Sequence, residues 1–206
     1  MPLKEYCIYT DEVGYGSWAG PVVVCSILYE KIDNYEVRDS KSLTKNMRNN
    51  TFHKIRNKYD FALSWSHAHD IDKFGLRVAT DDAIRKSWNM LKNKYNKLNK
   101  NSQLSSKNVN KMNILLDGKY IPKTIHNVIS LVNGDKNNLM ISYASIIAKE
   151  SRDFYMKQLG QFYCKYSWES NVGYGTKNHI DAINEFGITK FHRKSYKPLR
   201  KFSDSR

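Results

Sequence analysis

Short apolar runs alternate along the chain with longer segments in which apolar residues recur at helical spacing. The short runs are rich in β-branched and aromatic residues, which are typical of strands, and lie at 6–10, 21–29, 61–67, 114–117 and 127–132. The helical spacing covers 44–58, 76–91, 141–162 and 177–186. Three strands, helices and then a strand–strand–helix unit predict an α/β domain with a mixed sheet.

Local signals predict several boundaries. The first two strands flank a glycine-rich turn, so we expect them to form a hairpin. Thr44 is placed to cap the first helix, and Asp70 or Asp72 to cap the second. The Lys-, Asn- and Ser-rich segment 92–113 is expected to extend that second helix at first and then to form a linker. The basic end of the chain, 192–206, is expected to be partly extended.

The charge of the chain points to its partners. The 206 residues have 40% hydrophobic content, enough for one sizeable core, and a formal net charge of +14. Such an excess favours nucleic-acid phosphates or an anionic membrane surface as the partner. We find no basic amphipathic helix with a continuous apolar face, so nucleic acid is favoured over membrane. A compositional bias toward lysine and asparagine is the alternative explanation.

Cysteines and apolar runs exclude several other classes. Cys7, Cys25 and Cys164 are widely spaced and form no Cys-x-x-Cys pair, which argues against a thiolate zinc site. Cys7 and Cys25 lie in apolar runs and are expected to be buried as small hydrophobic residues. The chain starts without a signal-peptide pattern and has no run long enough to span a bilayer. We therefore expect a soluble, cytoplasmic protein that acts as a monomer.

Carboxylates stand at the ends of three predicted strands. They are Asp11 and Glu12, then Asp117, then Asp135. Carboxylates at neighbouring strand ends can converge on hard cations such as Mg²⁺ or Mn²⁺, and two such ions can clamp an in-line phosphoryl displacement. Adjacent strand residues point to opposite faces, so Asp11 and Glu12 share a site only if the strand distorts or ends there. Solvated turn residues are the alternative interpretation.

Several motifs, in order along the chain, resemble those of type 2 ribonucleases H (ribonuclease HII). They are Asp11–Gly16 with Ala19–Val24, Asp39–Thr44, Leu116–Gly118, Gly134–Lys136 with Ile141–Lys149 and Arg152-Asp153, Gly173–Thr176 with His179, and His192–Tyr196. Together they cover the chain from about residue 6 to residue 197.

The resemblance implies a ribonuclease H-like fold, with a mixed five-stranded sheet flanked by helices. It implies a catalytic domain at 1–165 and a small helical, basic C-terminal segment at 166–206 that packs on it. It also implies that the four carboxylates are the catalytic set and hold two Mg²⁺ or Mn²⁺ ions. The expected reaction is hydrolysis of the RNA strand of RNA/DNA hybrids, or of ribonucleotides embedded in duplex DNA, leaving 3′-hydroxyl and 5′-phosphate ends.

The resemblance also implies which residues bind the substrate. Distinguishing RNA from DNA requires contact with the 2′-hydroxyl, and glycines allow the backbone to approach it closely. The family reads the ribonucleotide with its Gly-x-Gly turn and with the tyrosine of its C-terminal motif. From the residues alone, a polar loop is expected to touch phosphate and a helix lysine to face the nucleic acid; a solvated loop and a plain surface lysine are the alternatives. The expected substrate-binding residues are Gly14, Tyr15, Gly16, Ser40, Lys41, Lys149 and Tyr174.

Two positions depart from the family pattern. Tyr15 stands where the family usually has arginine, and Gly75 where it usually has asparagine. Because tyrosine cannot supply a fixed cationic fork to phosphate, we expect relaxed specificity for the DNA–RNA junction. The alternatives are a non-catalytic hybrid-binding protein on the same fold and a type 3 ribonuclease H. The latter is disfavoured because the first motif begins near residue 6, without room for that family's extra N-terminal domain.

Overall fold

A mixed five-stranded sheet carries the fold, in the order β3-β2-β1-β4-β5. The computed structural model describes residues 5–31, 43–98, 112–122 and 125–203. The strands are β1 (Tyr6–Val13), β2 (Val22–Glu30), β3 (Asp60–Ser66), β4 (Asn113–Asp117) and β5 (Val128–Leu131). β1 pairs in parallel with β4, and β4 pairs in parallel with β5. The predicted α/β fold with a mixed sheet is confirmed.

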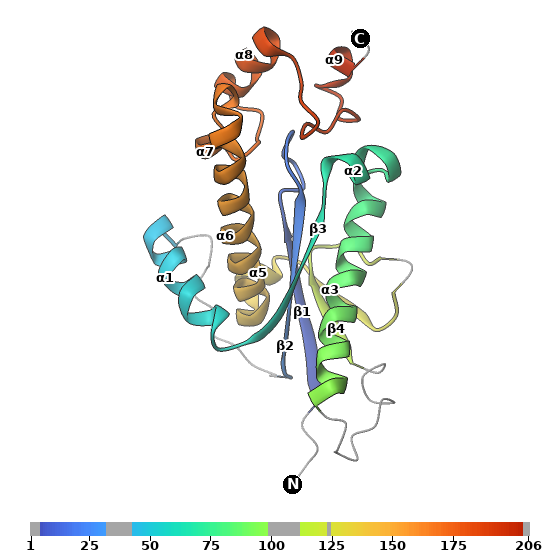
Figure 1. Cartoon of the computed structure of the whole chain (residues 1–206). Coiled ribbons are helices and arrows are strands. Elements are labelled where there is room, and N and C mark those ends of the chain that lie inside the picture. The colour runs from blue at the N-terminus through green and yellow to red at the C-terminus, as the bar shows by residue number, and fades with distance from the viewer. Residues whose placement is uncertain (1–4, 32–42, 99–111, 123–124, 204–206) are drawn as a thin grey trace. The chain divides into compact units, whose positions relative to one another are not determined.

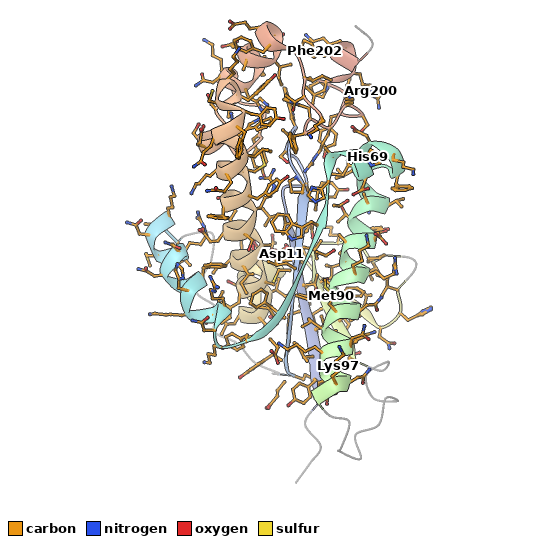
Figure 2. The ribbon with its side chains drawn as sticks, in the orientation of Figure 1. Asp11, His69, Met90, Lys97, Arg200 and Phe202 are labelled. Atoms are coloured by element: carbon orange, nitrogen blue, oxygen red, sulfur yellow. The ribbon has the colours of Figure 1, made fainter. Side chains whose placement is uncertain are left out.

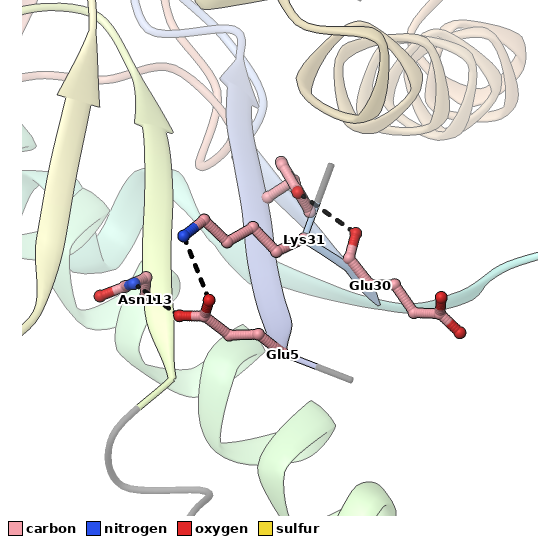
Figure 3. A network of polar contacts seen from close by, with 5 residues as sticks. Glu5, Glu30, Lys31 and Asn113 are labelled. Carbon is pink, nitrogen blue, oxygen red and sulfur yellow. Dashed lines mark hydrogen bonds and ion pairs between the residues drawn. The ribbon is translucent and has the colours of Figure 1, made fainter. Parts of the chain in front are cut away.

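Glu5 ties together three strand ends. Its carbonyl accepts a hydrogen bond from the backbone N–H of Lys31 over 2.7 Å, which joins the start of β1 to the end of β2. The two neighbouring strands therefore run in opposite directions, as expected for a hairpin. The Glu5 carboxylate lies 3.1 Å from Lys31 Nζ and accepts a 3.4 Å bond from Asn113 Nδ2 at the start of β4 (Figure 3).

Helices lie on both faces of the sheet (Figure 1). Trp88 of α3 donates to the Thr10 hydroxyl of β1 over 2.8 Å, whereas the next residue, Asp11, takes a hydrogen bond from Ser145 of α6. Successive side chains of β1 thus meet different helices, as strand alternation requires. The helices are α1 (Lys45–Arg56), α2 (Ala68–Phe74), α3 (Leu76–Leu98), α5 (Gly134–Asn137), α6 (Leu139–Phe162), the 3₁₀ helix η2 (Cys164–Tyr166), α7 (Trp168–Asn171), α8 (Lys177–Phe186) and α9 (Arg200–Ser203).

The chain divides into two compact units, each built from three stretches. The first unit comprises Met1–Glu12, Val24–Ser64 and Ile84–Glu150; its core includes Cys7 and Cys25, buried as expected. The second comprises Val13–Val23, Trp65–Ala83 and Ser151–Arg206, and its core includes Met156, Trp168 and Ile183. The expected domain boundary between residues 165 and 166 stays a prediction.

The predicted cap of the second helix is wrong. Two helices stand in place of one, because Gly75 ends α2 with φ 83° and ψ 149°, a conformation that is almost restricted to glycine. Asp72 lies inside α2, where its carboxylate accepts the backbone N–H groups of Lys194 and Ser195 over 3.0 and 2.9 Å. Gly75 therefore separates α2 from α3 and does not lie in the interior of a helix. The predicted extension beyond residue 92 is confirmed, since α3 runs to Leu98.

The remaining boundaries follow from caps and burial. Thr44 caps α1 as predicted, with its hydroxyl accepting from Met47 N over 3.3 Å. α6 starts at Leu139, two residues before the predicted start, because the Asn138 side chain caps it by accepting from the N–H groups of Met140 and Ile141. As far as residue 203, the basic end does not adopt the expected extended conformation, because turns and α9 follow the fully buried Arg193. In the described part of the chain, no helix is long and apolar enough to cross a membrane.

Candidate active site

Asp11 and Glu12 both lie inside β1, which continues to Val13 and does not end before the acids as predicted. Asp11, labelled in Figure 2, is 5% exposed. Its carboxylate accepts the N–H of Glu12 over 2.8 Å. Burial raises the pKa of Asp11 well above its usual range, and the charges of Glu12 and Asp117 raise it further. The Ser145 hydroxyl and the Glu12 N–H partly oppose this rise by donating to the ionised carboxylate.

Asp117 stands beside Asp11 because of the strand register. Thr10 pairs with Leu116 across the parallel strands β1 and β4, so Asp11 and Asp117 are the next residues on each strand. Burial raises the pKa of Glu12 to about 7, and the charge of Asp117 adds to the rise. We call Asp11, Glu12 and Asp117 the carboxylate cluster. Its members repel one another when ionised, and this is the condition that a divalent cation relieves.

Asp135 approaches the carboxylate cluster through its backbone. Asp117 Oδ1 accepts the N–H of Gly134 over 2.6 Å and that of Asp135 over 3.4 Å. A Cβ on Gly134 would lie 2.8 Å from Ile141 Cδ1 and 3.2 Å from Asp117 Oδ1, so only glycine allows this close approach. The Asp135 side chain is 1% exposed. Among the described residues, no three Asp, Glu, His or Cys side chains stand close enough together to hold a metal ion.

The Gly-x-Gly turn lies in the second unit and is held by a buried arginine. Arg193 donates from Nη2 to the Gly14 carbonyl over 2.8 Å and from Nη1 to the Tyr15 carbonyl over 2.9 Å. Its Nε donates to the Gly20 carbonyl over 3.0 Å. Although Arg193 belongs to the basic end of the chain, it contributes no exposed charge, because the side chain is fully buried in these backbone contacts.

A second buried arginine holds the other end of the same turn. Arg152 donates to the carbonyls of Pro21, Ala19 and Val172 over 2.9, 3.1 and 2.8 Å, and to the Ser17 hydroxyl over 2.7 Å. Burial lowers the pKa of its guanidinium to about 10, which leaves it charged at neutral pH. We call Arg152 and Arg193 the arginine clamp. Together they fix the backbone of the turn.

Tyr174 lies in a loop that is bonded to the turn within the second unit. The Gly173 carbonyl accepts the N–H groups of Trp18 and Ala19 over 2.8 and 3.1 Å. The Tyr174 ring lies 5.6 Å from the Arg152 guanidinium carbon and is 38% exposed, close to the 39% of Tyr15. The structure thus brings the expected substrate-binding residues of the turn and Tyr174 together.

The other expected substrate contacts lie elsewhere. Lys149 lies on α6 in the first unit, half-buried and one helical turn beyond Ser145. Ser40 and Lys41 lie outside the described residues, and their expected role in binding phosphate stays a prediction.

Sequence analysis did not single out Ser145, Arg152 and Arg193 as site residues. A signal for Arg152 was present, because it follows Ala144 and Ala148 at intervals of four on α6 and precedes Met156 by four. All four side chains are fully buried, so this face of the helix turns inward throughout. Arg193 carries no comparable periodic signal, because it lies outside regular secondary structure.

Comparisons with known proteins agree with these features. A model of the family Ribonuclease HII matches residues 8–199. The ribonuclease HII of Ehrlichia ruminantium (strain Welgevonden) is 33% identical over 196 residues, covering 94% of this chain and 86% of that protein. The crystal structure of ribonuclease H2 from Pyrococcus horikoshii OT3 superposes with a TM-score of 0.67 at 22% identity, covering 96% of each chain. That of Bst ribonuclease HIII in complex with Mn²⁺ gives 0.63 at 14% identity, covering 97% of this chain and 70% of that one.

The two structural similarities show the ribonuclease H-like fold. The family match and the relative at 33% identity extend over nearly the whole chain. The chain therefore belongs to the ribonuclease HII family of endoribonucleases.

Proposed function

We propose that the chain hydrolyses the RNA strand of RNA/DNA hybrids, or ribonucleotides embedded in duplex DNA, with Mg²⁺ or Mn²⁺ held by Asp11, Glu12, Asp117 and Asp135. The observation that carries the proposal is the carboxylate cluster, in which burial and mutual repulsion raise the pKa of Asp11 and Glu12. Carboxylate oxygens are the donors that these hard cations prefer. The Mn²⁺ complex of Bst ribonuclease HIII, which has a similar fold, supports the choice of metal.

The chain's own residues orient the acids. The amides of Gly134 and Asp135 hold one oxygen of Asp117, while Ser145 and the Glu12 amide hold Asp11. Bound divalent ions would supply an activated water and neutralise charge on the leaving oxygen. Hydrolysis that releases the 3′ oxygen leaves 3′-hydroxyl and 5′-phosphate ends, as expected for this family.

The turn is arranged to contact a ribose. In a trans peptide the N–H points opposite to the C=O. Because the Gly14 and Tyr15 carbonyls point to Arg193, the N–H groups of Tyr15 and Gly16 point away from it. Tyr15 and Gly16 are both exposed. This supports a role for these peptide groups in binding the 2′-hydroxyl, beside the ring of Tyr174.

A metal titration tests the proposed function. Wild type is compared with Asp11→Asn on an RNA/DNA hybrid, with chelator, Mg²⁺ or Mn²⁺ added, while hybrid binding is measured separately. Asp181→Asn, at an exposed position of α8, is the matched control for the change in charge. We expect metal-dependent cleavage in wild type and in the control, and loss of cleavage with retained binding in Asp11→Asn. Binding without cleavage in either metal would instead favour the non-catalytic alternative, and full activity of Asp11→Asn would remove the assignment.

We also infer that long hybrids are preferred over a single embedded ribonucleotide. Tyr15 is exposed where the family usually has arginine, so the turn lacks a side-chain fork for the phosphate at the junction. Tyr15→Arg is expected to raise incision at a single ribonucleotide relative to hybrid cleavage by about ten-fold, the effect of one charge-assisted contact of about 1.4 kcal/mol. Gln158→Arg, at an exposed position of α6, controls for the added charge. Equal rates on both substrates, unchanged in Tyr15→Arg, would refute this preference.

A further inference from the structure

We propose that His179 is a positioning residue for Tyr174 and acts through the backbone carbonyl of that tyrosine. The inference rests on the proposed function in one respect, namely that Tyr174 contacts the substrate. His179 itself is fully buried in α8 and touches no substrate. Its role is to fix the loop that presents the tyrosine ring.

The hydrogen bonds around His179 allow only one arrangement of protons. A backbone N–H can only donate, so the 2.9 Å contact from Thr189 N makes His192 Nδ1 an acceptor and leaves its proton on Nε2. That proton points to His179 Nε2 at 3.1 Å. The indole N–H of Trp168 donates to the same nitrogen over 3.1 Å. His179 Nε2 is therefore an acceptor, and the proton of the neutral ring lies on Nδ1.

The Nδ1 proton of His179 is directed at the Tyr174 carbonyl, 2.9 Å away. The same carbonyl accepts the backbone N–H of Thr176 over 2.8 Å, so both of its lone pairs are used. Burial lowers the pKa of His179, and burial with the neighbouring His179 lowers that of His192 to about 3. Both rings thus stay neutral, and the donor to Tyr174 persists at neutral pH.

The loop needs such a restraint because its backbone is strained. Val172 has φ 44° and Gly173 has φ 86°. A β-branched residue with positive φ is a rare conformation that persists only where surrounding contacts hold it. Arg152 holds the Val172 carbonyl and Trp18 holds the Gly173 carbonyl, while His179 holds the carbonyl of Tyr174 itself. The structure therefore restrains three consecutive peptide groups leading into the exposed ring.

Two substitutions separate this role from ordinary core packing. In His179→Asn the side-chain amide reaches the place of Nδ1 and can still donate to Tyr174, but the donors of Trp168 and His192 lose their acceptor. In His179→Gln the amide reaches the place of Nε2 and can accept from them, but the donor to Tyr174 is lost. Ile183→Val, one helical turn along α8 and in the same core, is the control for a simple packing loss.

The experiment measures KM and kcat for hybrid cleavage, the free energy of unfolding, and amide hydrogen exchange at residues 171–176. We expect His179→Gln to raise KM about five-fold, the loss of one hydrogen bond, with kcat within about two-fold of wild type. His179→Asn is expected to lose more stability than His179→Gln yet keep KM near wild type. Ile183→Val should lower stability with no change of KM.

A double-mutant cycle completes the test. If His179 acts through Tyr174, His179→Gln should have no further effect on KM in a Tyr174→Ala background. The proposal is overturned if KM rises as much in His179→Asn as in His179→Gln, or if the effect of His179→Gln persists without Tyr174. Hydrogen exchange at residues 171–176 should speed up in His179→Gln but not in His179→Asn, whether or not the protein cleaves. Absent cleavage by wild type would therefore remove the proposed function but leave the positioning role to be judged by exchange.

Discussion

The carboxylate cluster and the arginine clamp both bury ionisable groups, but they treat the charge in opposite ways. In the cluster, burial raises the pKa of Asp11 and of Glu12, and the like charge of Asp117 raises both further. In the clamp, each guanidinium is surrounded by backbone carbonyls that accept its protons. A buried charge that is satisfied by the protein holds structure in place. A buried carboxylate that is repelled by its neighbours is available to bind a cation from solution.

The largest expected effect separates activity from stability in the cluster. Asp117→Asn should lower hybrid cleavage by about 10³-fold or more, the order seen when one electrostatic contact to the transition state is removed. Its Oδ1 can still accept the amides of Gly134 and Asp135, and one repelling charge is gone. In chelator, the free energy of unfolding measured with urea should therefore not fall. A marked loss of stability would mean that Asp117 is held as tightly as the clamp.

The reverse is expected in the clamp. Arg193→Met removes the guanidinium donors to the carbonyls of Gly14, Tyr15 and Gly20 and should cost about 3 kcal/mol of unfolding free energy. Lys197→Met removes a positive charge from an exposed site in the same segment and is the control. Urea denaturation compares the two variants. If both lose the same small amount, the buried contacts of Arg193 do not hold the turn.

The last expected difference lies in the response to acid and is spread over several pH units. Glu12 has a folded pKa of about 7, above the ordinary 4.5, so the folded state binds its proton first and gains stability as pH falls through that window. His192 has a folded pKa of about 3, below 6.5, so the unfolded chain binds its proton first and stability is lost as pH falls from 6.5. Each contribution changes by about 1.4 kcal/mol per pH unit at most.

Variants separate the two contributions. Measured in chelator, Glu12→Gln should lose stability more steeply with acid than wild type, and His192→Asn less steeply. Parallel curves for wild type and both variants would contradict the assigned pKa shifts.

The fold could be predicted from the sequence where periodicity and caps agree. The range of α8 and the cap Thr44 follow from apolar spacing and a hydroxyl before the first turn. Prediction failed at Gly75, because the choice between a bend and a continuous helix depends on tertiary contacts such as those of Asp72. The end of β1 was also missed, because the strand continues through the polar residues Asp11 and Glu12 to Val13.

The candidate site shows the same limit. The candidate acids could be named because family motifs are visible in the sequence, and their role as metal ligands stays a prediction; Asp135 lies in α5 and not at a strand end. Most hydrogen-bond acceptors of Arg152 and Arg193 are backbone carbonyls, which have no signature in residue identity. The role of His179 likewise depends on which nitrogen faces which donor, and only three-dimensional geometry defines that.

The contact between Trp88 and Thr10 belongs to a longer line of hydroxyl groups in the core of the first unit. Ser87 donates to the Ile84 carbonyl, Ser26 and Ser87 lie 2.7 Å apart, and Thr10 and Ser26 lie 2.8 Å apart. Because the Ser87 hydroxyl donates to the Ile84 carbonyl, Ser26 must donate to Ser87 and Thr10 to Ser26. The Trp88 indole N–H donates to Thr10 and begins the line.

Each hydroxyl in this line donates to one defined acceptor, so the line favours one alignment of β1 in the sheet. A one-residue slip of β1 would turn Thr10 to the other face and leave Trp88 and Ser26 without partners in an apolar interior. The hydroxyls of Thr10, Ser26 and Ser87 thus oppose a slip of β1. The alignment that they favour keeps Asp11 opposite Asp117.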